Sequence, residues 1–210
     1  MIQNDGVPIV RQIEAAIEAF LAAQPDGSRR VTLRPLTSRD QREFLDLVGA
    51  SVDLHRPWMS LPSAPQEFQA YLTRRYEQPD AESLLICVRN TRAIAGMINI
   101  NSIIRGRFQS ASLAYAAFAP TAGQGYMSEG LNLVLRYAFE QLRLHRLEAQ
   151  IQPDNHASLN LVRRNGFRNE GYSPDLLFVD GVWQDHERWA ITSTMIDIAP
   201  TDPHPTLPER

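Results

Sequence analysis

The sequence has very little cysteine: Cys87 is the only one in 210 residues, so no intramolecular disulfide can form. Cys87 stands in the apolar run SLLICVR, which favours burial in a strand over a reactive thiol. No run approaches 18 apolar residues, and the first residues contain no basic segment followed by an apolar one. We therefore expect a cytoplasmic protein with neither a secretory signal nor a membrane span.

The chain also has no excess of positive charge. Its 21 Lys and Arg residues against 24 Asp and Glu residues give a net charge of -3, which provides no bulk attraction to nucleic acid or to an anionic membrane. A length of 210 residues with 43% hydrophobic residues is typical of one globular domain. We expect no direct nucleic-acid partner and no membrane partner.

The two ends of the chain differ in composition from the middle. Residues 1–28 form a predicted N-terminal helical extension, because 9–23 carries apolar residues at helical spacing and stops at the sequence PDG. This helix is compatible with packing on its own domain or across a homodimer, so the protein is a monomer or a homodimer. Residues 197–210 are rich in proline and predict a flexible tail. The folded domain is expected at 29–196.

The middle of the chain alternates between strand and helix patterns. Strands are predicted at 29–36, 83–89, 93–103, 110–119, 146–152 and in a hairpin across 172–191, and helices at 38–50, 65–77, 128–142 and 156–165. Asp180-Gly181 is a strong hairpin turn signal. The fold class is α+β, with α/β/α layers and a mostly antiparallel sheet that contains one parallel βαβ crossover.

Two glycines, Gly123 and Gly125, immediately precede the helix of this crossover, which opens with Ser128 and Glu129. Ligands of open sheets collect where a strand leads into a crossover helix, and unpaired amides at a helix N-terminus bind phosphate groups. The loop has no Gly-Lys-Ser/Thr, and Ser128 stands where a dinucleotide fingerprint needs a third glycine. Nucleotide hydrolysis and hydride transfer are thus disfavoured, and a structural turn remains the alternative to a ligand loop.

The following helix opens with the sequence NHAS. Asn155 is placed to cap this helix, which is the structural alternative. Because the helix follows the second strand of the crossover, Asn155 and Ser158 are also placed to line a slot for an extended cofactor arm.

Three segments carry a resemblance to a known family and occur in that family's order: GQGYMSEGL, NHASLNLVRRNGFRNEGY and FVDGVWQDH. The chain resembles the GNAT N-acetyltransferase superfamily, in particular its RimJ/RimL branch of ribosomal-protein-alanine acetyltransferases. The resemblance covers roughly 31–191 and is densest over 105–186. It implies a sheet with splayed central strands that hold acetyl-CoA as cosubstrate. We expect no metal at Asp185 to Glu187, because consecutive strand residues point to opposite faces of a sheet. The superfamily loop usually begins with Gln or Arg where this chain has Pro120, so the resemblance implies backbone contacts to the diphosphate.

The resemblance also implies the residues of the site. The cofactor-binding residues would be Phe118, Ala119, Gly123, Gln124, Gly125, Tyr126, Met127, Ser128, Asn155 and Ser158. Many relatives have a tyrosine acid where this chain has Val162, and the Rim branch instead implies Ser158. The candidate bases are Asp175, with an exposed edge-strand residue as the alternative, and Glu129, with stabilisation of the helix dipole as the alternative.

The segment LHRPWMSLP resembles the wall of the acceptor groove in the Rim branch, so His55, Trp58 and Tyr115 are candidate substrate-binding residues. Core packing is the alternative for the two aromatic residues, and we expect His55 in a solvated loop. The implied acceptor is a protein N-terminus, with a ribosomal protein as possible partner. A small amine acceptor, a longer acyl-CoA donor, and a non-catalytic module that binds acyl-CoA or ribosomes stay open.

Overall fold

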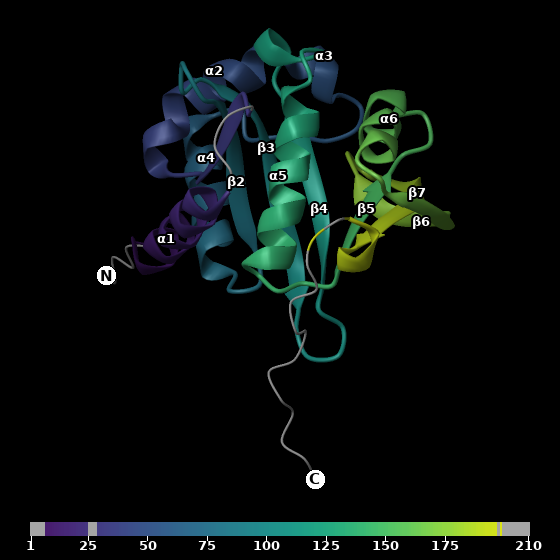
Figure 1. Ribbon diagram of the computed structural model, residues 1–210. Coiled ribbons are helices and arrows are strands. Elements are labelled where there is room, and N and C mark those ends of the chain that lie inside the picture. Colours follow the sequence, from purple (N-terminus) through teal and green to yellow (C-terminus); the bar gives the residue numbers. More distant parts are fainter. Residues whose placement is uncertain (1–6, 25–28, 197, 199–210) are drawn as a thin grey trace.

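Seven strands form one sheet through the middle of the molecule (Figure 1). The structure is a computed structural model, and it describes residues 7–24, 29–196 and 198. The strand order is β1-β2-β3-β4-β5-β7-β6, with β4 and β5 parallel and the other neighbours antiparallel. The strands are β1 (Val31–Pro35), β2 (Glu82–Val88), β3 (Ile94–Ile104), β4 (Ser110–Ala117), β5 (Arg146–Ile151), β6 (Arg168–Val179) and β7 (Val182–Thr192).

Helices cover both faces of this sheet, and Figure 1 shows α5 lying across its middle. The helices are α1 (Val7–Ala23), α2 (Gln41–Ala50), α3 (Val52–His55), α4 (Pro65–Glu77), α5 (Tyr126–Glu140) and α6 (His156–Arg164). Alternate residues of β2 belong to different cores: Leu84 and Ile86 pack with α1 and α5, whereas Leu85 and Cys87 pack with α2 and α4. Strand side chains alternate between faces, so two buried faces confirm the predicted α/β/α layers.

The N-terminal helix α1 packs on its own chain. Ile13, Ile17 and Phe20 are buried on one side of the helix, as their spacing of four and three residues predicts. The ring of Phe20 meets that of Tyr137 from α5 edge to face, with centroids 5.6 Å apart. The helix therefore shares a core with the sheet. The predicted tail at 197–210 lies outside the described residues, apart from position 198.

The crossover β4-α5-β5 opens the sheet. β4 and β5 pair only from Ser110 with Arg146 to Ser112 with Glu148, and the rest of β4 continues without β5 as a neighbour. This separation confirms the expected splay of the central strands. The start of α5 lies close to the sheet because Gly130 has no side chain, and a Cβ there would come within 2.3 Å of Ile86 Cδ1.

The predicted elements are present, with shifted ends. Helix α5 begins at Tyr126 rather than at Ser128, because the backbone of Gly125, at φ +85°, already turns into the helix. The first hairpin strand begins at Arg168 rather than at 172, immediately after Gly166 ends α6 with φ +83°. Within the described residues, no helix is both long and apolar enough to cross a bilayer.

Candidate active site

A cleft of about 530 Å³ lies where β4 and β5 separate. Its walls come from α3 and the segment after it, from β4, from the glycine loop with the start of α5, and from α6. The lining residues are Asp53, Leu54, His55, Trp58, Met59, Tyr115, Ala116, Ala117, Thr121, Ala122, Gly123, Gly125, Tyr126, Met127, Ser128, Asn155, Ala157, Ser158, Asn160, Leu161 and Arg164. Most of the predicted site residues thus meet in one cavity.

The glycine loop brings backbone to one end of this cleft. Gly123 and Gly125 have φ of +75° and +85°, a left-handed conformation that other residues rarely adopt. Nothing lies within 4 Å of where a Cβ on Gly123 would stand, so the loop faces open space. Since α5 has no side-chain cap, the first amides of the helix at Tyr126, Met127 and Ser128 are suited to bind an anion.

An ion pair holds the outer side of the glycine loop. Arg30 Nε donates to Glu129 Oε1 at 2.6 Å, and an Arg30 Nη2 proton goes to the carbonyl of Gln124 at 3.0 Å. The same guanidinium lies 4.7 Å from the ring centroid of Tyr126. The hydrogen bond to Glu129 raises the pKa of Arg30. Neither Glu129 nor Gln124 lines the cleft, so this arrangement positions the loop from outside.

Asn155 and Ser158 line the cleft and also perform local structural roles. Asn155 Oδ1 accepts a hydrogen bond from the Ser158 amide at 3.1 Å, which is the capping geometry that the sequence offered as an alternative. Capping leaves the amide nitrogen of Asn155 as a possible donor to a ligand. Ser158 Oγ lies 2.6 Å from the hydroxyl of Tyr115. The pair joins α6 to β4 across the opened sheet.

Tyr115 stands on β4 and is partly buried in the cleft wall. Burial raises the pKa of its phenol to about 12, and the hydrogen bond with Ser158 opposes this shift. The phenol therefore keeps its proton at neutral pH. This hydroxyl pair was missed by sequence reasoning, which placed Tyr115 on the acceptor side, because nothing in the spacing of residues 115 and 158 indicates that the two side chains meet.

His55 is buried rather than solvated, and that expectation was wrong. Its side chain is 6% exposed, and Nε2 donates to the carbonyl of Ala117 at 2.8 Å. The end of α3 is thereby fixed against the end of β4, with the imidazole at the cleft wall. Trp58, three residues further along, is partly buried and also lines the cleft.

Two further predicted residues, Phe118 and Ala119, lie off the cleft wall. Phe118 is fully buried in the core under α2 and α4, where its ring contacts Phe44 at a centroid distance of 5.8 Å. The amide of Ala119 donates to Ser51 Oγ at 2.9 Å. Neither residue is therefore among those that line the cleft, where β4 contributes Tyr115, Ala116 and Ala117, because β4 ends before Phe118 and the chain turns into the other core.

The candidate base Asp175 lies on β6 and is exposed. Its backbone, at φ +48°, forms part of an irregular stretch of the β6–β7 pairing between Ser173 and Leu177, and its amide donates to Asp185 Oδ1 at 2.9 Å. Asp53 is the one carboxylate among the cleft-lining residues of the described chain. Those residues also contain no group of three or more His, Cys, Asp or Glu suited to a metal.

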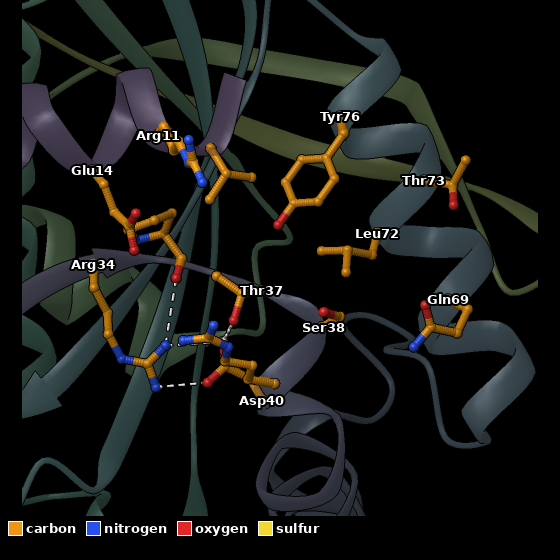
Figure 2. Close-up of a pocket in the computed structure, with 13 residues that line it drawn as sticks. Arg11, Glu14, Arg34, Thr37, Ser38, Asp40, Gln69, Leu72, Thr73 and Tyr76 are labelled. Atoms are coloured by element: carbon orange, nitrogen blue, oxygen red, sulfur yellow. Dashed lines mark hydrogen bonds and ion pairs between the residues drawn. The ribbon is translucent and has the colours of Figure 1, made fainter. Parts of the chain in front are cut away.

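A larger groove of about 750 Å³ lies at the far edge of the sheet, between α1, the end of β1 and α4 (Figure 2). Two of its charged groups form an ion pair: Arg34 Nη2 lies 2.8 Å from Oδ1 of Asp40, whose other oxygen accepts a hydrogen bond from Thr37 Oγ1 at 2.9 Å. Burial raises the pKa of Tyr76 to about 12, and its hydroxyl donates to the Leu36 carbonyl. The groove shares no lining residue with the cleft, so we place the chemistry at the cleft.

Three features meet in the cleft: the separation of β4 from β5, the glycine loop at one end, and the Tyr115–Ser158 hydroxyl pair inside. Together they are the features of an acyltransferase site. Residues 30–168 match the acetyltransferase (GNAT) domain family, and the chain belongs to this family. It is a GNAT N-acetyltransferase, as the order of its sequence motifs predicts.

Named relatives act on different amines. The chain is 29% identical to the ribosomal protein uS5-alanine N-acetyltransferase of Escherichia coli (strain K12), over 78% of this chain and 88% of that protein. It is 25% identical to spermidine N(1)-acetyltransferase of Vibrio cholerae, over 77% of this chain and 92% of that protein. Among solved structures, it resembles Mycobacterium smegmatis RimJ in complex with CoA-disulfide, with TM-score 0.73, 26% identity, and coverage of 80% and 85% of the two chains.

Proposed function

We propose that the protein transfers an acetyl group directly from acetyl-CoA to the N-terminal α-amine of a protein, with a ribosomal protein as the candidate acceptor. The observation that carries the proposal is the single cleft that holds both the glycine-loop amides and the Tyr115–Ser158 hydroxyl pair. The similarity to the uS5-alanine acetyltransferase supports the acceptor. A cytoplasmic location follows from this proposed acceptor.

The residues of the cleft fit acetyl-CoA as substrate. The amides of residues 123–128 would hold the diphosphate, since Gly123 has a left-handed backbone and open space where a Cβ would stand. The extended pantetheine arm would lie beside Tyr115, Ala116 and Ala117, where β4 has lost β5 as its neighbour and has main-chain groups to offer. The side-chain nitrogen of Asn155 would donate to the same arm.

The reaction needs the acceptor amine in its neutral form. Its nitrogen attacks the thioester carbonyl carbon, a C–N bond forms, and the C–S bond breaks with both electrons going to sulfur. The amine loses one proton, which we assign to water held by Asp53. Ser158, itself hydrogen-bonded to the protonated Tyr115, donates to the developing thiolate. A thiolate has a conjugate-acid pKa near 8.5, so a hydrogen bond suffices to stabilise it.

The energetics of proton removal favour an α-amine over a lysine side chain. At pH 7 an α-amine with a pKa near 8 costs only about 1.4 kcal/mol to deprotonate, whereas a lysine amine costs roughly 4.6 kcal/mol. The cleft offers the exposed Asp53 rather than a buried strong base. Such a site suits the weaker proton-transfer demand of a protein N-terminus.

The test is acetyl transfer to short peptides that begin with alanine. We expect Ser158→Ala to lower kcat at least tenfold while the Kd for acetyl-CoA changes less than twofold, since the Ser158 hydroxyl acts on the leaving sulfur. An unchanged kcat would remove Ser158 from the mechanism. Mass spectrometry of ribosomal protein N-termini from cells with and without the protein would then identify the acceptor.

A small-molecule amine is the second candidate acceptor, and the similarity to a spermidine acetyltransferase favours it. Transfer rates with alanine peptides and with polyamines distinguish the two acceptors. Transfer rates with acyl-CoA donors of increasing chain length identify the acyl group. Membership of the GNAT family argues against a non-catalytic binding module.

A further inference from the structure

A second cavity, the hairpin pocket, adjoins the cleft on its acceptor side and has a volume of about 460 Å³. Its walls include Trp58 from the segment after α3, Asp154 from the loop between β5 and α6, and Tyr172, Trp183 and Asp185 from the β6–β7 hairpin. Trp58 lines both cavities, so they meet at its indole. An acceptor with its amine in the cleft is therefore able to place a second group in the hairpin pocket.

The pocket carries charge of one sign. Among the described residues that line it are two carboxylates, Asp154 and Asp185, and no Lys, Arg or His. Asp185 accepts hydrogen bonds from the Tyr172 hydroxyl and from the Asp175 amide. These bonds, the one from Tyr172 first, lower the pKa of Asp185, so its carboxylate stays ionised at neutral pH. The pocket consequently carries negative charge at neutral pH.

The remaining character of the pocket is aromatic. Tyr172 and Trp183 are 52% and 57% exposed and line the same pocket, and large apolar side chains that gather at one place on a surface are typical of an interaction site. Ser60 Oγ donates to Asp180 Oδ1 at 2.8 Å and thereby ties the segment of Trp58 to the turn of the hairpin. The aromatic and acidic walls are thus connected, and aromatic faces beside carboxylates attract cations.

We propose that the hairpin pocket binds a positively charged group of the acceptor, so that the enzyme selects amines with a second cation near the attacked nitrogen. One residue of extended peptide advances by about 3.5 Å, so in a protein acceptor this cation is an Arg or Lys within the first few residues. In a polyamine it is the next ammonium group. The inference deepens the proposed function and rests on it.

A binding test separates the pocket from the chemistry, because it uses peptides that cannot react. Two hexapeptides begin with N-acetylalanine and carry either arginine or glutamine at the second and third positions, and each is titrated calorimetrically into the enzyme with coenzyme A present. We expect the arginine peptide to bind about tenfold more tightly, as befits a cation held at a partly exposed aromatic and acidic site. Equal affinities would overturn the proposal.

Matched variants localise the effect. Asp154→Asn should reduce the affinity ratio to about threefold, because it removes one of the two carboxylates. Asp46→Asn removes the same charge from an exposed position on α2 outside both cavities, and should leave the ratio at tenfold. An equal loss of the ratio in both variants would assign the preference to net charge and overturn the pocket.

Transfer assays identify the source of the cation. The same peptides with free N-termini and spermidine are compared as acceptors by kcat/KM. A tenfold advantage of the arginine peptide supports the pocket on a protein acceptor. Faster transfer to spermidine supports the pocket and overturns the proposed α-amine acceptor. Equal transfer to both peptides leaves the proposed function standing and overturns the selection by charge.

Discussion

The cleft has a donor end, at the glycine loop, and an acceptor end, near Trp58, and the two ends differ in whether backbone or side chains form the wall. At the donor end, where acetyl-CoA would bind, the wall is the glycine loop with the start of α5, and the side chains that support this loop, Arg30 and Glu129, pair outside the cleft. At the acceptor end, the walls of the cleft include the side chains of His55 and Trp58, and the adjoining hairpin pocket adds Asp154 from a distant segment of the chain.

This difference suggests that binding of the donor depends on backbone conformation, whereas the choice of acceptor depends on particular side chains. Backbone amides bind a diphosphate whatever the side chains are, provided that the backbone adopts the required left-handed turns. Side chains at the acceptor end set charge and shape, and a single substitution changes them. We therefore expect the donor end to respond to changes in backbone conformation and the acceptor end to changes in side-chain chemistry.

The largest expected effect is at Gly123. Gly123→Val places a β-branched residue at φ +75°, which strains the loop by roughly 1–3 kcal/mol and displaces the amides behind it. We expect the Kd for acetyl-CoA, measured by calorimetry, to rise about ten- to a hundredfold. A Kd within twofold of the wild type would show that the loop does not bind the diphosphate.

Gly106 provides the matched control for this strain. Like Gly123 it has a positive φ, +69°, and no atom within 4 Å of the place where a Cβ would stand, but it lies in the loop between β3 and β4. Gly106→Val should lower the melting temperature as much as Gly123→Val does and leave the Kd for acetyl-CoA unchanged.

Tyr115 tests the middle of the cleft, where side chains act on the reacting group. Tyr115→Phe removes the hydroxyl that bonds Ser158 and should lower kcat about tenfold with a small change in the Kd for acetyl-CoA. A kcat equal to that of the wild type would reduce the pair to a structural contact.

The pH dependence of kcat gives a second check on Tyr115. Because burial raises the pKa of its phenol to about 12, the protonated form persists until the pH approaches that value. For wild-type enzyme with an alanine peptide, kcat should rise as the amine loses its proton near pH 8 and then stay level to about pH 10. A fall between pH 9 and 10 that is absent from Tyr115→Phe would show that Tyr115 ionises earlier.

Local patterns in the sequence were sufficient for the fold and for the position of the glycine loop at the start of a helix. The apolar spacing of Ile13, Ile17 and Phe20 predicts a helix with one buried side, and Gly123 with Gly125 before a helix predicts a phosphate-binding loop, because both signals lie within a few consecutive residues. The end of a buried strand was harder to predict. β4 ends at Ala117, and Phe118 then packs into the core under α2 and α4.

The side-chain partners at the site were not readable from the sequence, because each joins segments that only the tertiary fold brings together. Tyr115 and Ser158 are 43 positions apart, and Arg30 and Glu129 are 99 apart. His55 was expected in a solvated loop, yet it is buried, and the carbonyl at the end of β4 accepts a hydrogen bond from its buried nitrogen. The contacts of Tyr115 and Ala117 depend on the tertiary position of the end of β4, where it no longer pairs with β5.

Glu129 has the smallest expected effect and decides between its two predicted roles. A general base contributes about a hundredfold or more to the rate, whereas an exposed ion pair that supports a loop contributes little. Since Arg30 holds the Glu129 carboxylate outside the cleft, we expect Glu129→Gln to raise the Kd for acetyl-CoA at most about threefold and to keep kcat within the same factor. Asp53→Asn, which alters the carboxylate inside the cleft, is the comparison and should lower kcat further. A hundredfold loss of kcat in Glu129→Gln alone would make Glu129 the base, and would mean that the donor end also uses a side chain for chemistry.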